Sequence, residues 1–263
     1  MHPILFELGP FTVTGYGTAM VVAILVGWWL TQRVARRLLP SVVSEEELWL
    51  DLYFGLILGG LLGAKVLLIL VEWPELISGE VDFVSLALAG GVWLGGVAGA
   101  VAFGAWFVHR HRLPTARVVD TLVTGLPLAH AIGRAGCLLA GCCYGAACEL
   151  PWAITYTDPA AHEIAGTPLG VPLHPSPIYE MLAELFNFTV LLAILRRRPK
   201  PWTLTATWAL LYGTERFFLE FLRGDSRGAL ATWSTSQWIC AVLVALGIFL
   251  LWRRPGAKAE GTI

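Results

Sequence analysis

Charged side chains are scarce in this sequence. Only 14% of its 263 residues are Asp, Glu, Lys or Arg, and 56% are hydrophobic. A soluble domain carries about 25% charged residues, so this chain has too few charges to cover a surface that faces water. The apolar content excludes a disordered chain, and the formal net charge of -1 gives no sign of a nucleic-acid partner. The composition therefore predicts an integral membrane protein.

The first residues, MHPILFELGPFTVTGYG, lack a cationic leader and a small-residue cleavage site. We therefore expect no removable signal peptide, and the first apolar segment should remain as a membrane helix. Such a helix needs about 20 mostly apolar residues. The sequence predicts an all-α protein with a single polytopic membrane domain over residues 1–263 and seven spans. These lie at 16–39, 48–72, 86–108, 118–140, 177–195, 203–222 and 236–252.

Positive charge is concentrated in alternate connections between these spans. Most Lys and Arg residues follow spans one, three, five and seven, whereas residues 141–176 contain none. By the positive-inside rule, the connections rich in Lys and Arg lie in the cytoplasm. We therefore expect the N-terminus outside and the C-terminus in the cytoplasm. Residues 141–176 should then form an extracytoplasmic cap between spans four and five, and residues 253–263 a cytoplasmic tail.

A few charges lie inside the apolar spans. Arg134 and Arg216 are the clearest, and a charge at the centre of a membrane helix costs at least ~2.5–3.5 kcal/mol on insertion scales. They should face the bundle interior in the outer half of the membrane. Tyr212, Arg216, Glu220 and Arg223 are spaced by four, four and three, which places them on one helical stripe. Two readings are open: a salt-bridge stripe that joins helices, or a phosphate site of a phospholipid headgroup, which arginine suits.

The segment HPSPIYE opens span five. Ser176 is a good helix N-cap and Pro177 a good first helical residue. A plain helix start does not require the polar residues His174, Tyr179 and Glu180, so these three are candidate site residues.

Four of the five cysteines, Cys137, Cys142, Cys143 and Cys148, gather where span four meets the outer loop. Structural disulfides or apolar packing are the first reading, since disulfides are allowed outside the plasma membrane. A reactive thiol and a metal site are the others, although the spacing matches no standard zinc pattern. Cys240 stands apart and is expected to be a small core residue.

Several motifs together resemble the prolipoprotein diacylglyceryl transferase family over residues 5–252. They are Tyr16-Gly17, GRAGCLLAGCCYG (133–145), HPSPIYE (174–180) and YGTERFFLEFLRGD (212–225). The resemblance implies a multi-pass enzyme of the bacterial plasma (inner) membrane, with its site towards the extracytoplasmic face. It would transfer the diacylglyceryl group of phosphatidylglycerol to the lipobox cysteine thiol of a preprolipoprotein and release glycerol phosphate. Its partners would be membrane lipids and the signal segment of the preprolipoprotein, with no nucleic acid, cofactor or metal.

The motif matches also imply residue roles. Arg134 would bind phosphate and Arg216 would be the second essential arginine. The residues around the site would be Tyr16, Tyr212, Glu220 and Arg223.

The chain departs from the family pattern at three positions. Cys137 replaces a usual Asn, Cys142 replaces a frequent acidic residue, and Leu94 stands where the family has a histidine that acts as general base. Leucine cannot take a proton, whereas His130, four residues before Arg134, can accept one from a thiol. Alternatively, the arginines alone lower the pKa of the thiol.

Two other functions remain open at this stage. One is a paralogue that transfers a phospholipid-derived group to another acceptor, which the substitution at Leu94 favours. The other is a non-enzymatic lipid- or anion-binding membrane protein or a transporter. A transporter should carry polar residues along a path through the inner half of the membrane, and the first five spans and the seventh show few of them.

Overall fold

The computed structural model describes residues 4–9, 11–43, 46–224, 229–230 and 232–253. The expected tail, 253–263, therefore lies outside the described residues except for Arg253. The described part contains seven helices of 17 or more residues. They are α1 (Gly15–Leu38), α3 (Glu46–Val71), α6 (Trp93–Arg110), α7 (Thr115–Ala140), α9 (Ser176–Arg196), α10 (Thr203–Leu219) and α11 (Thr235–Trp252).

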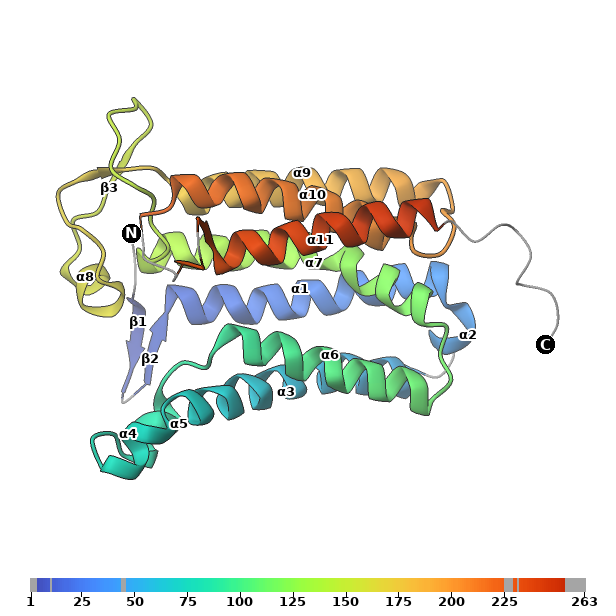
Figure 1. The fold of residues 1–263 in the computed structure, drawn as a ribbon, viewed down its shortest axis with the longest axis horizontal. Coiled ribbons are helices and arrows are strands. Elements are labelled where there is room, and N and C mark those ends of the chain that lie inside the picture. Colours follow the sequence, from blue (N-terminus) through green and yellow to red (C-terminus); the bar gives the residue numbers. More distant parts are fainter. Residues whose placement is uncertain (1–3, 10, 44–45, 225–228, 231, 254–263) are drawn as a thin grey trace. The chain divides into compact units, whose positions relative to one another are not determined.

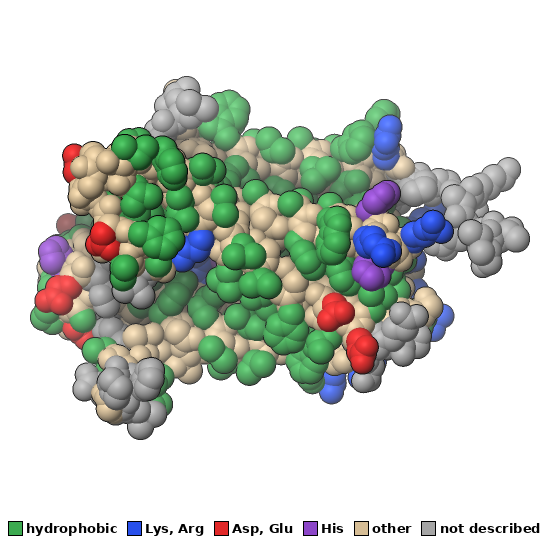
Figure 2. Space-filling view, turned by 90° about the horizontal axis from the view of Figure 1, so that it is seen from below, with side chains coloured by type: hydrophobic (Ala, Val, Ile, Leu, Met, Phe, Trp, Pro, Cys, Tyr) green, Lys and Arg blue, Asp and Glu red, His purple; other side chains and the backbone are tan. Residues whose placement is uncertain are grey.

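Five of these helices are long and apolar enough to cross a membrane: α1, α3, α7, α9 and α11. This confirms a predominantly helical membrane protein. In the face drawn in Figure 2, hydrophobic side chains are spread over the middle among backbone and other side chains, and few charged or histidine side chains lie there. That distribution suits helices whose central turns meet lipid and whose ends meet water.

The sequence-based boundaries of the third span are wrong. The predicted span 86–108 is split into α5 (Phe83–Leu88) and α6, with a break at residues 89–92 that contains Gly90 and Gly91. Glycine is among the least favourable residues for a helix interior. The predicted span 203–222 ends as an α-helix at Leu219 and continues as a 3-10 turn, η1 (Glu220–Leu222).

Short elements that the all-α expectation missed connect the helices. An antiparallel hairpin precedes α1, formed by β1 (Ile4–Leu8) and β2 (Phe11–Thr14), with Gly9 at φ 59° in its turn. Two further strand pairs are two residues long: β3 (Ile154–Thr155) with β4 (Pro172–Leu173), and β5 (Ala229–Leu230) with β6 (Trp233–Ser234). The remaining helices are α2 (Pro40–Val43), α4 (Trp73–Ser78) and α8 (Pro159–Ala165).

The chain divides into two compact units, Met1–Val34 with Val119–Ile263, and Ala35–Val118. In the second unit, α3 and α6 pack together through glycines. A Cβ atom at Gly63 would collide with the carbonyl oxygen of Gly95, and one at Gly99 would lie 2.9 Å from the Cα of Gly63. Small residues at this spacing let two membrane helices approach closely.

Lys65 has a structural role in the same unit. Its Nζ donates hydrogen bonds to the carbonyl oxygens of Leu86 (3.1 Å), Ala87 (2.8 Å) and Ala89, at the end of α5. These carbonyls have no partner within the helix, and a cation is favourable at a helix C-terminus. Lys65 therefore caps α5.

In the first unit, α9, α10 and α11 lie side by side (Figure 1). Close approaches join the other two helices, because a Cβ at Gly136 of α7 would lie 2.8 Å from the Cβ of Ala19 of α1. Asp120 of α7 is fully buried, and its Oδ1 accepts hydrogen bonds from Thr205 N (2.8 Å) and Thr205 Oγ1 (2.6 Å). Asp120 thus binds the first turn of α10.

The segment after α7 is ordered by polar contacts along its length. Thr167 Oγ1 donates to the carbonyl of Gly141 (2.6 Å), and Asp158 caps α8 by accepting from Ala160 N (3.0 Å). Gly145 forms backbone bridges with Arg223 and donates to the carbonyl of His174 (3.1 Å). These contacts bring the ends of α7, α10 and the beginning of α9 to one place.

Candidate active site

Helix α9 carries three buried polar side chains on one face. Glu180, Glu184 and Asn187 are spaced by four and three, and none is more than 2% exposed. A carboxylate removed from water is costly unless it is paired. The partners of these residues therefore define the polar interior of the first unit.

Glu180 lies between two arginines. Its Oε2 is 2.6 Å from Arg134 Nε, in an ion pair, and its Oε1 accepts a hydrogen bond from Arg223 Nη1 at 3.0 Å. All three side chains are largely buried. Two guanidinium groups against one carboxylate leave one positive charge, so the cluster is suited to an anion.

His130 extends this cluster along α7. Arg134 Nε donates to His130 Nε2 at 3.0 Å, and His130 Nδ1 contacts the carboxylate of Glu184. Because Nε2 accepts a hydrogen bond, this network assigns the ring proton to Nδ1. A continuous chain therefore runs from Arg223 through Glu180, Arg134 and His130 to Glu184.

Arg216 forms a second ion pair within α10 and η1. Its Nη2 is 2.6 Å from Glu220 Oε2, and Ser234 Oγ donates to Glu220 Oε1 at 2.8 Å. Arg216 is only 5% exposed, and its Nη1 has no hydrogen-bond partner among the described residues. Buried donors without an acceptor are costly, so this guanidinium is prepared to receive acceptor oxygens.

The predicted single stripe on the sixth span is wrong at its end. Arg216 and Glu220 pair as expected, but the α-helix ends before Glu220 and Arg223 has extended backbone at φ -78° and ψ 142°. Arg223 therefore leaves the helical face and joins the cluster of Glu180 and Arg134. Tyr212 stays on α10, stacked on Trp208 at 5.3 Å, with its ring centre 5.9 Å from that of His130.

The remaining predicted site residues make contacts of their own. Tyr179 Oη accepts a hydrogen bond from Trp152 Nε1 (2.7 Å) and lies 3.4 Å from His174 Nδ1. Tyr16 on α1 is 43% exposed and interacts electrostatically with Arg134. Leu94 lies on α6 in the second unit and is 45% exposed.

Sequence reasoning missed Glu184, Asn187, Glu215 and Ser234. Asn187 Nδ2 donates to Glu215 Oε2 at 2.8 Å, which joins α9 to α10. The signal for Glu184 was available, because a second carboxylate four residues after Glu180 in an apolar helix shares its face. Ser234 could not be found in this way, since it is distant in sequence from Glu220.

None of the five cysteines forms a disulfide in the structure, so the disulfides considered from the sequence are absent. Cys143 lies just beyond α7, and hydrogen bonds with Cys137 and Cys142 lower the pKa of its thiol, as does the charge of Arg134. Burial raises the pKa of Tyr156 to about 12.

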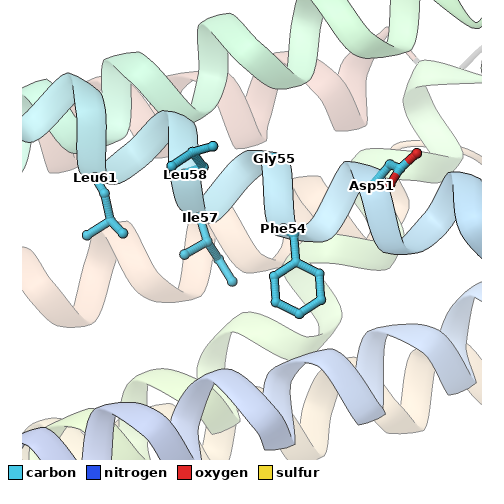
Figure 3. A pocket seen from close by; sticks show the side chains of 6 residues that line it. All are labelled: Asp51, Phe54, Gly55, Ile57, Leu58 and Leu61. Carbon is cyan, nitrogen blue, oxygen red and sulfur yellow. The ribbon is translucent and has the colours of Figure 1, made fainter.

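A separate feature lies on α3. An open depression of about 470 Å³ is lined by Asp51, Phe54, Gly55, Ile57, Leu58 and Leu61. Phe54, Ile57 and Leu61 project from one side of the helix (Figure 3). The depression is apolar apart from Asp51 and contains none of the candidate site residues, so it is not part of the candidate active site.

The fold and the site define a class: a helical membrane protein with a buried cluster of arginines and carboxylates. A family model described as "Prolipoprotein diacylglyceryl transferase" matches residues 3–253. The match covers nearly the whole chain, so this chain belongs to the prolipoprotein diacylglyceryl transferase family.

Individual relatives agree with this assignment. The chain is 31% identical over 251 residues to a phosphatidylglycerol–prolipoprotein diacylglyceryl transferase of Clostridium tetani, covering 95% of this chain and 96% of the relative. It is 35% identical to a second such transferase of Clostridium perfringens over 74% of each chain. It is 29% identical to the transferase of Pseudomonas entomophila over 98% of this chain and 97% of the relative.

Proposed function

We propose that this protein transfers the diacylglyceryl group of phosphatidylglycerol to the lipobox cysteine thiol of preprolipoproteins and releases glycerol phosphate. Family membership supports the reaction. The observation that carries it at the site is the buried network of Arg134, Glu180 and Arg223, whose spare positive charge matches a phosphate.

The membrane arrangement is part of the proposal. Seven spans cross the bacterial inner membrane, with the N-terminus outside and the C-terminus in the cytoplasm. The charge bias of the connections supports this orientation. Residues 141–176 then cover the site on the extracytoplasmic side.

Arg134 and Arg216 act on the leaving group. Glycerol phosphate departs as a phosphate monoester, and its growing charge is stabilised by fixed cationic donors. Glu180 holds Arg134 in place, and Arg216 offers Nη1, which has no hydrogen-bond partner among the described residues. Tyr16, His174, Tyr179 and Tyr212 surround these groups as substrate-binding residues, with Glu220 fixing Arg216.

His130 is the proposed proton acceptor for the thiol. It lies within hydrogen-bond distance of Arg134, and Glu184 orients its ring. A neutral imidazole can take a proton near neutral pH. Its Nε2 becomes available when Arg134 turns to the phosphate.

The reaction can be tested with purified protein, phosphatidylglycerol and a lipobox peptide. The mass of the peptide should increase by one diacylglyceryl group. Arg134→Ala and Arg216→Ala should reduce turnover by about 10²-fold or more, because each removes a donor for the developing charge. Arg→Lys should not restore full activity, since lysine lacks the planar fork.

Arg110→Ala is the matched control, because Arg110 is exposed at the end of α6. It should keep wild-type turnover, and all variants should reach the membrane in equal amounts. The proposal would be overturned if the peptide stayed unmodified in the presence of phosphatidylglycerol and the protein also failed to rescue a strain depleted of its own enzyme. Near-normal turnover in both alanine variants would remove the phosphate role of the arginines.

A second candidate keeps the scaffold but changes the acceptor, and Leu94 at the position of the family histidine favours it. A deletion strain would then show an altered lipid profile while its lipoproteins remain correctly modified. Unmodified lipoproteins in that strain would exclude this alternative.

A further inference from the structure

Three thiols meet beside the proposed site. The Sγ atoms of Cys137, Cys142 and Cys143 all lie within 4.8 Å of one another. Sulfurs that share a zinc ion at about 2.3 Å each lie roughly 4 Å apart. Small adjustments of the side chains would therefore let all three bind one ion.

The backbone after α7 is shaped to bring these sulfurs together. The helix ends at Ala140, Gly141 turns the chain at φ 73°, and Cys142 N donates to the carbonyl of Cys137 at 3.1 Å. Cys143 adopts φ 59°, in the left-handed region that residues other than glycine rarely occupy. Strained backbone of this kind concentrates at functional sites.

The surroundings suit an anionic cluster of thiolates. Arg134 interacts electrostatically with Cys137 and Cys143, and Arg223 forms a hydrogen bond with Cys143. The Oη atom of fully buried Tyr156 has no hydrogen-bond partner among the described residues, and this residue also interacts electrostatically with the three thiols. Outer groups that carry charge or donate hydrogen bonds orient the ligands of metal sites.

We propose that Cys137, Cys142 and Cys143 form a three-thiolate site for Zn²⁺, with its fourth coordination position open to the thiol of the acceptor substrate. Three protein ligands with an open position are typical of catalytic rather than structural zinc. Three thiolates and one Zn²⁺ carry one negative charge, and Arg134 and Arg223 interact with the thiols. Soft thiolate ligands favour zinc over magnesium or calcium.

The role of the open position rests on the proposed function. The acceptor thiol binds Zn²⁺ as a thiolate and releases its proton to His130, the proposed proton acceptor. Its sulfur forms a bond to the glyceryl carbon of phosphatidylglycerol as the bond from that carbon to the phosphate oxygen breaks. The electron pair leaves with glycerol phosphate, and the neutral thioether then dissociates from the metal. Zinc would thus remove the need for a histidine at the position of Leu94.

Metal content tests the site without any assay of activity. Full-length protein purified in detergent with a reductant and no chelator is equilibrated with Zn²⁺, desalted and measured by elemental mass spectrometry. We expect about one zinc per chain. The triple variant with Cys137→Ser, Cys142→Ser and Cys143→Ser should contain at least about tenfold less zinc per chain.

Cys148→Ser and Cys240→Ser are the matched controls, because neither residue belongs to the three-thiol group. Both should retain wild-type zinc content. Three results would each overturn the site. The triple variant could bind as much zinc as the wild type, or the wild-type protein could bind none. The three cysteines could also contain a disulfide in protein isolated without reductant. If the triple variant does not fold, single serine variants that elute as monodisperse protein replace it. Each of them should bind less zinc than the wild-type protein.

Cobalt tests the open position. Sulfur-to-cobalt absorption should appear in the wild type and rise by about one third when a lipobox peptide adds a fourth sulfur. A peptide with serine in place of the cysteine should leave the spectrum unchanged, and a fourth-sulfur signal that never appears would overturn this role. Zinc binding without diacylglyceryl transfer would contradict only the proposed function, and transfer by zinc-free protein would contradict only this inference.

Discussion

At the scale of single residues, the site depends on paired charges. Glu180 neutralises one of two buried guanidinium groups, and Glu184 fixes the ring of His130. Removing one partner of a buried pair leaves an uncompensated charge, which costs about 3–5 kcal/mol. Replacing a carboxylate by its amide keeps the shape, so it separates the charge from the packing.

Glu184→Gln should lower kcat by about tenfold or more, with little change in KM for phosphatidylglycerol. The amide keeps contact with His130 but cannot hold the imidazolium that forms when the ring takes a proton. Steady-state kinetics with the lipobox peptide would measure both parameters. Glu163→Gln, an exposed change on α8, is the control, and a His130→Gln variant with normal kcat would remove His130 as the base.

At the scale of elements, helix pairs are held by glycine contacts and by a buried cap. In α3 and α6 the glycines allow backbone-to-backbone contact, which explains why this part of the chain is so rich in them. In the first unit, Asp120 binds the first turn of α10 through Thr205. These two features make separate predictions about stability.

Gly99→Ala should destabilise the protein by about 1–3 kcal/mol, because the added methyl group meets backbone atoms of α3 that cannot move aside. Gly90→Ala is the control, since a Cβ there has nothing within 4 Å. Thermal denaturation in detergent, followed by size-exclusion chromatography, would compare them. An equal Tm for both variants would show that the helices do not rely on this approach.

Asp120→Ala should destabilise the protein by about 1–3 kcal/mol, because it leaves the buried N–H and hydroxyl of Thr205 without an acceptor. Asp120→Asn should cost less, since an amide oxygen can take the place of Oδ1. The same thermal assay applies, and a smaller loss in the alanine variant than in the asparagine variant would contradict the capping role.

At the scale of the whole molecule, orientation decides where the site works. The connection at 141–176 is free of positive charge, whereas the one after α9 is rich in it. The positive-inside rule therefore places these two connections on opposite sides of the membrane. This orientation is open to a direct measurement.

Alkaline phosphatase fused after Glu163 should be active, and the same fusion after Lys200 should be inactive, because the reporter forms its disulfides only outside the cytoplasm. A fluorescent protein that folds only in the cytoplasm should give the opposite pattern at both positions. Phosphatase activity after Lys200 would reverse the proposed orientation.

The sequence by itself determined the class of protein, because apolar length and the shortage of charge leave no other environment for these helices. It also singled out Arg134, Arg216 and Glu180, since charged residues in an apolar helix must serve a purpose. Its boundaries failed where glycines interrupted the third span.

Only the tertiary structure decided which charges pair. Glu180 meets Arg134 and Arg223 from three separate parts of the chain, and the turn at Cys143 brings three sulfurs to one point. Local spacing fixes which residues share a helical face, but it cannot tell which faces of distant helices meet. That depends on packing between segments far apart in sequence, such as the close contact of Gly136 with Ala19.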